Sequence, residues 1–371
     1  MRVGVYIDRM YLQGGLQRVV ANLLQEWDAL GWETHLITES AGADVFTLPA
    51  ATRRHVLLSR PKQRGLAGVL DNFRIVRGLR SFLRVTSLDA VIALSPVANV
   101  HLAMAGSGSS TILIGSQYDY APHHPISAVK RLFLRYFYPR LDALVCATTE
   151  ATDLAVSAYP GTRGVRIPLW SSPAQGAAGQ VARVADWIRP GRKVFCACGR
   201  FNLLKGFREL VEIFDAIKDA HPDWDLLIIG DGEDHDILYE MVAARGLQGR
   251  VLMPGWVGNP AEFFAASHIF VFPSRSEGFG LVLIEAMTSG LPCIAYDCKV
   301  GPAEIVTHEA DGLVVPDGER AAFQAAMIRL ARDEPLRRTF ATKARLAIRR
   351  FDAKAVQPRW DELLSAKRKA C

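Results

Sequence analysis

Two glutamates set among glycines make residues 273–286 the most informative segment of the sequence. The segment reads P-S-R-S-E-G-F-G-L-V-L-I-E-A, so seven residues separate Glu277 from Glu285. Carboxylate oxygens accept hydrogen bonds from vicinal hydroxyls such as those of a ribose or a hexose, and backbone amides donate to phosphates. The segment therefore predicts a site for a sugar or a nucleotide. For two isolated glutamates the alternative is one capping residue and one solvated residue.

Two cations occur in a second glycine-containing segment, 199–206, which reads G-R-F-N-L-L-K-G. Arg200 offers a planar fork of donors and Lys205 a point charge, and both groups bind phosphates in proteins. The segment follows an apolar run and precedes an amphipathic one, so we expect a strand-to-helix loop with both cations beside a phosphate. The alternative is a pair of solvated surface cations.

A third motif is the pair Gly14 and Gly15, which follows the first predicted strand and opens the first predicted helix. Glycines at this place let backbone N–H groups approach an anion at a helix N-terminus. The pair lacks the G-x-G-x-x-G spacing of a dinucleotide-binding fold. On its own it leaves an anion site and a plain turn equally open.

The elements that must position these motifs follow from the apolar pattern. In the helix predicted from residue 16, apolar residues recur at i, i+3, i+4, i+7, i+8 and i+11. Alternating strands and helices imply an α/β fold whose mostly parallel sheets are covered on both faces, with ligands beyond the carboxyl ends of the strands. The predicted strands are 3–7, 34–38, 90–94, 111–114, 143–147, 194–198, 225–229, 251–253, 268–272, 293–296 and 313–315, and the predicted helices of the second half are 207–220, 235–245, 281–289 and 321–332.

Residues 168–192 interrupt this alternation with proline, serine and glycine. We therefore predict a domain at 1–170, a linker at 171–192, a second domain at 193–345 and a final helical segment at 346–371 that crosses back to the first domain. A length of 371 residues is suited to two domains.

Composition excludes several classes of protein. Hydrophobic residues make up 50% of the chain and charged residues 22%, as in soluble globular proteins. Six cysteines without a C-x-x-C pair argue against a disulfide scaffold and against structural zinc. The sequence has neither a signal-peptide core nor a run of about 18 apolar residues, which predicts a reduced, cytoplasmic protein.

The net charge of +6 resides in the first half of the chain, where residues 1–168 hold 18 Lys and Arg against 12 Asp and Glu. Within 53–84 there are nine basic residues and one acid, Asp71. An anionic membrane surface, a phosphate-bearing substrate or nucleic acid would explain the excess. A second basic segment, 130–140, also contains aromatic residues. As a helix it would lie on an anionic membrane, or else bury its aromatic side chains under a solvated basic edge.

Together these segments resemble the retaining family-4 glycosyltransferases, which have the GT-B fold of two Rossmann-like, doubly wound domains facing a central cleft. The family's pair of glutamates separated by seven residues is met by Glu277 and Glu285, and its G-F-G-x-V/L-x-x-E-A-M-x-x-G-x-P text by residues 278–292. The resemblance covers nearly the whole chain. It implies that 1–170 is the acceptor-side domain and that 193–345 binds a nucleotide sugar.

The resemblance also implies roles for single residues. Arg200 and Lys205 would hold the donor diphosphate, Glu285 the ribose, and Glu277 would lie near the transferred sugar, so Glu277, Arg200 and Lys205 form the predicted catalytic group. The predicted donor-binding residues are Gly14, Gly15, Gly199, Trp256, Val257, Gly278, Phe279, Gly280, Leu281 and Glu285, with the backbone at Trp256 and Val257 meeting the base.

The sequence departs from the family at one place in the first domain. Many relatives carry a Ser-Glu-His-like segment whose histidine lies near the reacting sugar, whereas this chain reads S-Q-Y-D at 116–119, with His123 and His124 beyond. No catalytic histidine is carried over. Tyr118 and Asp119 are predicted to line the acceptor side.

The implied activity is transfer, with retention of configuration, of a hexose or N-acetylhexosamine from a nucleotide-diphosphate sugar to a hydroxyl of a lipid-linked or cell-surface glycan. A UDP-sugar is the favoured donor, because residues 297–302 resemble branches that use UDP-galactose-type or N-acetylated donors, and GDP-mannose stays open. Cations and amides would stabilise the leaving diphosphate, so we expect no cofactor and no metal. The predicted partners include an anionic membrane surface, and the predicted location is the inner face of the cytoplasmic membrane.

Three other classes of protein remain as alternatives. A nucleotide-sugar epimerase can share this architecture and would release a changed sugar nucleotide without an acceptor. A nicotinamide-dependent oxidoreductase needs a dinucleotide fingerprint, which Gly14 and Gly15 do not supply. The pI near 9.0 suggests a nucleic-acid-binding protein. No recognised binding module accompanies the basic half, so nucleic acid is not an expected partner.

Overall fold

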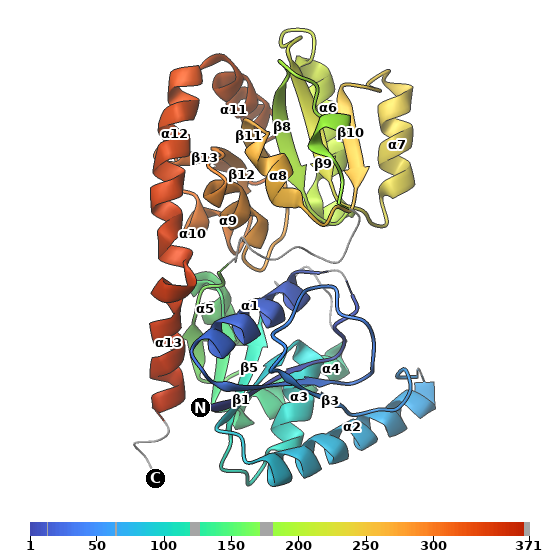
Figure 1. Cartoon of the computed structure of the whole chain (residues 1–371), viewed down its shortest axis with the longest axis vertical. Helices are drawn as coiled ribbons and strands as arrows, with labels where there is room; N and C mark the ends of the chain where they lie inside the picture. Colours follow the sequence, from blue (N-terminus) through green and yellow to red (C-terminus); the bar gives the residue numbers. More distant parts are fainter. Residues whose placement is uncertain (13, 64, 119–126, 171–180, 367–371) are drawn as a thin grey trace. The chain divides into compact units, whose positions relative to one another are not determined.

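The computed structural model describes residues 1–12, 14–63, 65–118, 127–170 and 181–366. The chain divides into two compact units: unit 1 is Met1–Ser172 with Ala353–Cys371, and unit 2 is Pro173–Asp352. Each unit contains one parallel sheet flanked by helices (Figure 1). The predicted α/β class, with two Rossmann-like domains, is confirmed.

The sheet of unit 1 has seven strands in the order β3-β2-β1-β4-β5-β6-β7, and each pair of neighbours is parallel. The chain builds outward from β1 in one direction and then from β4 in the other, so the topological switch point lies between these two strands. The elements are β1 (Arg2–Ile7), α1 (Gly15–Ala29), β2 (Glu33–Thr38), β3 (Arg53–Val56), α2 (Gly65–Thr86), β4 (Ala90–Leu94), α3 (Pro96–Ala105), β5 (Ile112–Gln117), α4 (Ala128–Phe137), η2 (Tyr138–Arg140), β6 (Ala143–Cys146), α5 (Thr149–Ala158), β7 (Gly164–Arg166) and α13 (Ala353–Ser365).

Helix α13 belongs to unit 1 although it follows unit 2 along the chain. Its Trp360 is fully buried and meets Trp27 of α1 edge to face, with ring centroids 5.7 Å apart. The Trp27 indole N–H also donates to the Gln357 side-chain oxygen over 3.2 Å. The core of unit 1 is therefore completed by a helix from the far end of the sequence.

The sheet of unit 2 has six strands in the order β10-β9-β8-β11-β12-β13, all parallel, with its switch point between β8 and β11. Its elements are η3 (Val184–Asp186), β8 (Lys193–Cys198), η4 (Leu203–Lys205), α6 (Phe207–Ile217), β9 (Trp224–Ile229), α7 (His235–Ala244), β10 (Val251–Gly255), α8 (Pro260–Ala265), β11 (Ile269–Phe272), α9 (Leu281–Thr288), β12 (Cys293–Asp297), α10 (Pro302–Ile305), β13 (Gly312–Pro316), α11 (Arg320–Arg332), α12 (Glu334–Ala347) and η5 (Ile348–Phe351).

The second half of the predicted linker packs on unit 2. Within 181–192, the backbone N–H of Ala182 donates to the side-chain oxygen of Asn259 over 3.1 Å, and the Asn259 amide donates back to the Ala182 carbonyl over 3.0 Å. The 3-10 turn η3 follows. Residues 181–192 of the predicted linker therefore belong to the ordered structure of unit 2 before β8 begins.

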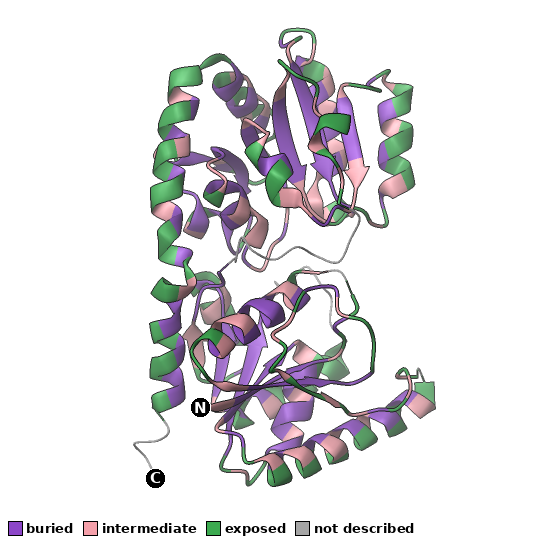
Figure 2. Ribbon diagram, in the orientation of Figure 1, coloured by how far each residue is buried: buried purple, intermediate pink, exposed green. Residues whose placement is uncertain are grey.

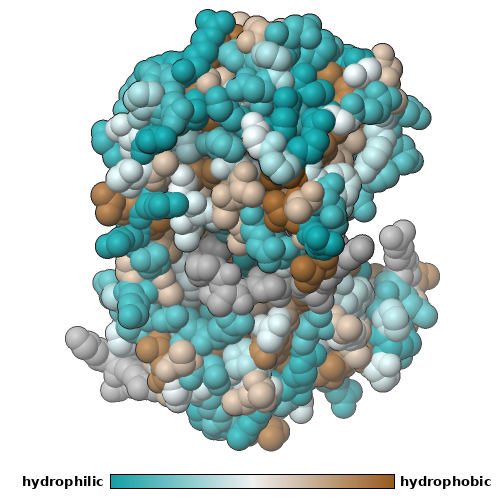
Figure 3. Space-filling model, turned by 45° about the horizontal axis from the view of Figure 1, so that its top comes forward, coloured by the Kyte–Doolittle hydropathy of each residue, from teal (hydrophilic) through white to brown (hydrophobic). Residues whose placement is uncertain are grey.

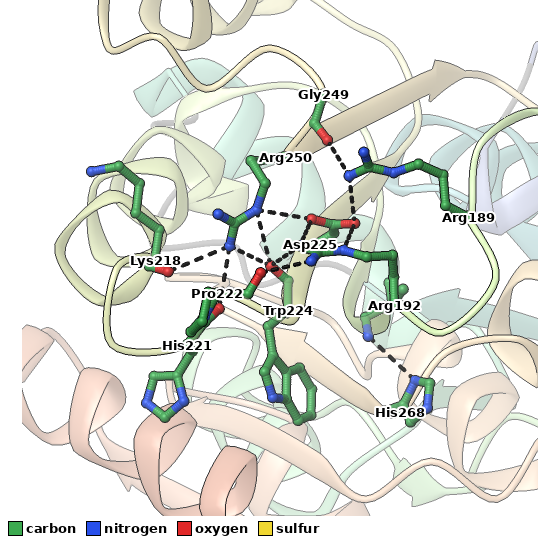
Figure 4. Close-up of polar contacts among 11 residues, drawn as sticks. Arg189, Arg192, Lys218, His221, Pro222, Trp224, Asp225, Gly249, Arg250 and His268 are labelled. Carbon is green, nitrogen blue, oxygen red and sulfur yellow. Dashed lines mark hydrogen bonds and ion pairs between the residues drawn. The ribbon is translucent and has the colours of Figure 1, made fainter.

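An arginine cluster holds the amino edge of the unit 2 sheet together (Figure 4). The Asp225 carboxylate is almost fully buried and accepts from Arg192 over 2.8 and 2.5 Å, from Arg250 over 3.0 Å and from Arg189 over 3.3 Å. Both Arg192 and Arg250 also donate to the Trp224 carbonyl. These contacts tie β9 to the segments that lead into β8 and β10.

Burial follows the layers of the fold. The central strands are buried almost throughout, whereas the edge strands β3 and β7 are exposed or half-buried. The helices are buried on the side that meets a sheet and exposed on the other (Figure 2). On the face drawn in Figure 3, hydrophobic side chains are scattered among hydrophilic ones. No helix in the described ranges combines the length and the apolar character needed to cross a bilayer.

Candidate functional site

The two motif-bearing loops of unit 2 leave neighbouring strands at the switch point. Strands β8 and β11 are paired, with Phe195 opposite Ile269 and Cys196 opposite Phe270. The loop after β8 carries Arg200 and Lys205, and the loop after β11 carries Glu277. In open parallel sheets the carboxyl edge at the switch point is where ligands bind.

Close backbone contacts hold these loops together. The backbone N–H of Arg275 donates to the Leu204 carbonyl over 2.8 Å. Gly206 has a positive φ of 71°, and a Cβ at this position would lie 2.2 Å from the carbonyl oxygen of Pro273. Only glycine fits such a position, so the glycine that ends the 199–206 motif is needed for loop packing.

The loop after β9 closes on the same segment from the other side. The Phe201 N–H donates to the Asp231 carbonyl over 2.9 Å. A Cβ on Gly230, whose φ is 140°, would come within 1.9 Å of the Gly199 carbonyl oxygen. Three strand-to-helix loops, after β8, β9 and β11, are thus fixed against one another.

Lys205 and Glu277 meet across the switch point. The Lys205 ammonium donates to a Glu277 carboxylate oxygen over 2.5 Å, and the two side chains are 24% and 10% exposed. Burial raises the pKa of the Cys298 thiol, in the loop after β12, to about 12, and the Glu277 charge adds to that shift. The structure therefore brings two of the three predicted catalytic residues into direct contact.

Arg200 has a different partner, Glu233, which we did not predict. The guanidinium makes a two-pronged contact with the Glu233 carboxylate at 3.0 and 2.7 Å, and both side chains are well exposed. The backbone N–H of Glu233 and the Arg200 guanidinium keep the pKa of this carboxyl below its ordinary value. Glu233 lies in the loop after β9, in the text G-D-G-E-D at 230–234, which reads as a turn.

The segment between Glu277 and helix α9 presents its backbone rather than its side chains. Phe279 is buried and packs edge to face on Phe351, with ring centroids 5.5 Å apart. Gly280 takes a left-handed φ of 102° directly before α9, which begins at Leu281. The amides of a helix's first turn have no partner within the helix and attract anions. Glu285 lies in the second turn of α9 and is half-buried.

Arg275 anchors the Glu277 loop and was also missed by sequence reasoning. Its guanidinium contacts the carboxylates of Glu209 and, over 3.3 Å, Asp317, and it stacks over the Tyr296 ring at 4.5 Å. These partners come from α6, β12 and the end of β13. Arg275 therefore acts as a positioning residue two places before Glu277.

Trp256 and Val257 follow β10, farther along the same edge of the sheet. The Gly255 carbonyl accepts from the Gly230 N–H over 3.0 Å, which joins this loop to the loop after β9. Val257 is buried. The indole N–H of Trp256 is buried as well and has no acceptor among the described residues.

The predicted residues of unit 1 lie at the carboxyl edge of the other sheet. Gly14 precedes α1 with an extended backbone, and a Cβ on Gly15 would meet nothing within 4 Å. Packing therefore does not require glycine at position 15. Tyr118 follows β5, and burial raises the pKa of its hydroxyl well above the ordinary value. Asp119, His123 and His124 lie outside the described residues.

This geometry is suited to binding an anion. Unit 2 offers an ammonium, a guanidinium and helix-terminal amides at one edge of its sheet. Each cation is neutralised by a carboxylate, which an anion of higher charge, such as a phosphate, can displace. In the part of the chain that the structure describes, His, Cys, Asp and Glu form no group of three that would hold a metal ion. The assignment of Arg200, Lys205, Glu277 and Glu285 to a donor stays a prediction.

Comparisons with protein families match both halves of the chain. Residues 14–170 match the glycosyl transferase 4-like domain, and residues 183–347 match the glycosyl transferases group 1.

Three curated relatives illustrate the range of similar proteins. An exopolysaccharide phosphotransferase of Streptomyces coelicolor is 29% identical over 83% of this chain, but the match covers only 31% of that protein. The amylovoran biosynthesis glycosyltransferase AmsD of Erwinia amylovora is 34% identical over 46% of this chain and 47% of its own. A Campylobacter jejuni N-acetylgalactosaminyltransferase that acts on a diphospho-undecaprenol glycan is 25% identical over 95% of this chain and 96% of its own. The chain thus spans less than half the length of the first two relatives.

Solved structures share the fold. Sucrose-phosphate synthase from Thermosynechococcus elongatus superimposes with a TM-score of 0.83 at 17% identity, over 100% of both chains. Anabaena HepE, solved with UDP-glucose, gives a TM-score of 0.79 at 18% identity, over 98% of this chain and 100% of that chain. At these identities the likeness establishes the architecture alone.

Proposed function

Because the chain belongs to the family-4 glycosyltransferases, which have the GT-B fold, we propose that it moves a sugar from a nucleotide-diphosphate donor to a glycan hydroxyl. The proposed donor carries a hexose or an N-acetylhexosamine, and the acceptor is a lipid-linked or cell-surface glycan. The observation that carries this proposal is the contact between Lys205 and Glu277 at the switch point of unit 2.

The chemical task is to stabilise a leaving diphosphate. Negative charge grows on the diphosphate as the bond to the sugar breaks, and Lys205, Arg200 and the amides before α9 would face that charge. Lys205 exchanges its bond to Glu277, and Arg200 its bonds to Glu233, for phosphate oxygens. Preorganised donors of this kind are each worth about 2.7–4 kcal/mol of barrier lowering.

The two signature glutamates have separate proposed roles. Once Lys205 turns to the diphosphate, the Glu277 carboxylate is released to accept hydrogen bonds from hydroxyls of the transferred sugar. Glu285, on α9, binds the ribose hydroxyls of the nucleotide. The acceptor hydroxyl approaches from the face on which the diphosphate departs, through an oxocarbenium-like state. Its oxygen bonds to the sugar carbon as the bond to the diphosphate breaks, and its proton passes to the departing diphosphate oxygen, so the configuration is retained.

UDP is the proposed nucleotide of the donor. Anabaena HepE and Staphylococcus aureus TarM, which share the fold, were solved with UDP, and this supports the choice. A GDP-mannose-dependent mannosyltransferase and a nucleotide-sugar epimerase are the competing assignments. A screen of UDP- and GDP-sugars for slow hydrolysis, read by mass spectrometry, separates the donors. An epimerase would give an isomeric sugar nucleotide and no free sugar.

Substitution of Lys205 tests the site. Lys205→Ala is expected to lose most turnover and to stay folded. Lys218→Ala is the matched control, because Lys218 has a similar exposure of 27% and also pairs with a carboxylate, that of Asp215, over 2.9 Å. Wild-type turnover in a folded Lys205→Ala protein would contradict the proposed function.

A peripheral location at the inner face of the cytoplasmic membrane is part of the proposal. In the basic segment 130–140, Phe133 and Tyr136 are 48% and 58% exposed, so the aromatic side chains do not all turn into the core. Exposed aromatic residues among cations are typical of helices that lie on anionic membranes. Flotation with anionic and with neutral vesicles tests this, and equal recovery with both would exclude an electrostatic contribution.

A further inference from the structure

Unit 1 carries an apolar groove that the proposed transfer chemistry does not use. The groove lies among α2, α3 and α4 and has a volume of about 370 Å³. Helix α3 packs against both α2 and α4 and so forms the floor, while the other two helices form the walls. This volume falls within the range of small-molecule sites.

The lining is almost entirely hydrocarbon. Val97 and Val100 of α3, Phe73 of α2 and Phe133 of α4 are among nine apolar lining residues. The three polar ones are Asn72, His101 and Lys130.

His101 is a fixed part of the floor. Its Nδ1 lies 3.0 Å from the Tyr6 hydroxyl and 3.2 Å from a Glu39 carboxylate oxygen, and all three side chains are buried. Glu39 in turn accepts from Lys62 over 3.1 Å. A polar network beneath the groove thus holds α3 to the ends of β1 and β2.

The walls continue outward as exposed apolar surface. Phe73 is 65% exposed, and Leu66, one turn beyond the groove on α2, is 87% exposed. On α4, Val129 and Leu132 are likewise exposed, each by 67%. Exposed apolar residues gathered along two walls of one groove mark a surface that another apolar group covers.

The groove begins at the carboxyl edge of the unit 1 sheet, the edge at which open parallel sheets bind ligands. Helix α3 follows the carboxyl end of β4, with Ser95 as its cap, and Val97 lies in its first turn. Helix α4 returns the chain toward the amino end of β6, so its first turn, which contains Lys130, is also at the carboxyl edge. Gly14 and Gly15 follow β1 at this same edge.

Charge defines the chemistry of the occupant. Lys130 lines the groove from the first turn of α4, Arg131 is its neighbour in that turn, Arg135 lies in the last turn, and α4 contains no acidic residue. Among the described residues, no carboxylate lies within ion-pair distance of these three cations. A ligand with an apolar chain and an anionic head therefore satisfies both the walls and the rim.

We propose that this groove holds the hydrocarbon chain of a phosphate-bearing lipid acceptor, with the acceptor's phosphate at Lys130 in the first turn of α4. The inference rests on the proposed transfer to a lipid-linked glycan and identifies where that lipid is held. The groove fixes the chain along α3, so the glycan attached to the phosphate extends from the carboxyl edge of the unit 1 sheet. This is a site for one lipid molecule, distinct from adsorption of the protein to a bilayer.

Photo-crosslinking to a lipid phosphate tests the site directly. The probe is farnesyl phosphate with a diazirine near the end of its chain, used with the full-length protein, and labelled peptides are mapped by mass spectrometry. Phe73→Glu places a charge in one wall. Val85→Glu is the matched control, because Val85 is exposed on the same helix and does not line the groove. Thermal melting establishes that both variants are folded.

The expected result is labelling of α2, α3 and α4 that Phe73→Glu lowers about tenfold, as suits the loss of an apolar contact, and that Val85→Glu leaves unchanged. Inorganic phosphate should not displace the probe, whereas unlabelled farnesyl phosphate should. Labelling outside the three helices, equal labelling of both variants, or full displacement by phosphate alone would overturn the inference. Hydrolysis of the donor sugar, measured on the same preparations, reports on unit 2 separately, so failure of the groove and failure of the proposed transfer are distinguishable.

Discussion

The two edges of the unit 2 sheet use arginine in opposite ways. At the amino edge, three guanidiniums converge on Asp225, whose side chain is 1% exposed, and they also donate to backbone carbonyls such as that of Trp224 (Figure 4). At the carboxyl edge, Arg200 meets the single exposed carboxylate of Glu233. The arginines around Asp225 hold a buried carboxylate that a ligand anion cannot replace, whereas Arg200 can exchange the exposed Glu233 carboxylate for a ligand anion.

Burial and the number of partners distinguish an ion-pair cluster that stabilises the fold from one that can bind a ligand. Buried, many-partner networks are costly to disturb because removing one member leaves uncompensated charge. Exposed one-to-one pairs contribute little to stability. Lys205 and Glu277 are intermediate, being partly buried but paired one to one. Substitutions at both edges should therefore separate stability from activity.

The largest expected effect is on stability at the amino edge. Asp225→Asn removes the charge that neutralises three guanidiniums, and the free energy of unfolding should fall by about 3 kcal/mol. Asp223→Asn is the control, because Asp223 is about half exposed and forms an ion pair with Lys193 alone among the described residues; its cost should stay under about 1 kcal/mol. Equal urea midpoints for the two variants would remove the distinction between the edges.

At the carboxyl edge the expected loss is in turnover. Glu277→Gln keeps the shape of the side chain and removes its charge, so sugar transfer should fall about a hundred- to a thousandfold while the thermal midpoint changes little. Initial rates with a saturating donor measure this. A variant with normal rates, or one that loses rate only because it unfolds, would argue against a role for Glu277 at the sugar.

A smaller effect is expected from Glu233. Glu233→Gln frees Arg200 from its carboxylate, so a nucleotide diphosphate should bind severalfold more tightly, with no change in stability. Titration calorimetry with UDP at low and high salt checks this, and the gain should shrink as salt screens the charges. Weaker binding of UDP would mean that Glu233 positions Arg200 rather than competing for it.

The smallest expected effect is a loss of stability at acidic pH. Burial, with the charges of Arg337 and Lys193, lowers the pKa of His268 below its ordinary value of 6.5, and its Nδ1 accepts from the Val194 N–H over 3.2 Å. The unfolded chain therefore takes up this proton first, so stability should fall as the pH drops below about 6.5. Urea unfolding at neutral and acidic pH measures the slope. His268→Gln should flatten it, and an unchanged slope would contradict this cause.

The buried strands could be predicted because both faces of a parallel sheet are covered, which makes each strand an apolar run. The edge strands β3 and β7 could not. The residues of β3 read R-R-H-V, and three of the four side chains are exposed. Pairing with a neighbour, not hydrophobic pattern, makes this segment a strand.

For the candidate site, the sequence predicts the loops that carry the residues but not the contacts that these residues make. Arg200, Lys205 and Glu277 all fall in glycine-containing loops between strand and helix, which sequence spacing indicates. Their partners depend on strand order, because β8 lies between β9 and β11. A single sequence does not reveal that order, so Glu233 and the anchor Arg275 were overlooked.

Helix α13 has a consequence for how the protein is made. Residues 1–172 of unit 1 leave the ribosome first, yet Trp27 packs against Trp360, which is synthesised only after all of unit 2. Until then, a large indole surface on α1 stays uncovered in the nascent chain. The N-terminal half is thus expected to need chaperone shielding during translation, while unit 2 can fold as soon as it emerges.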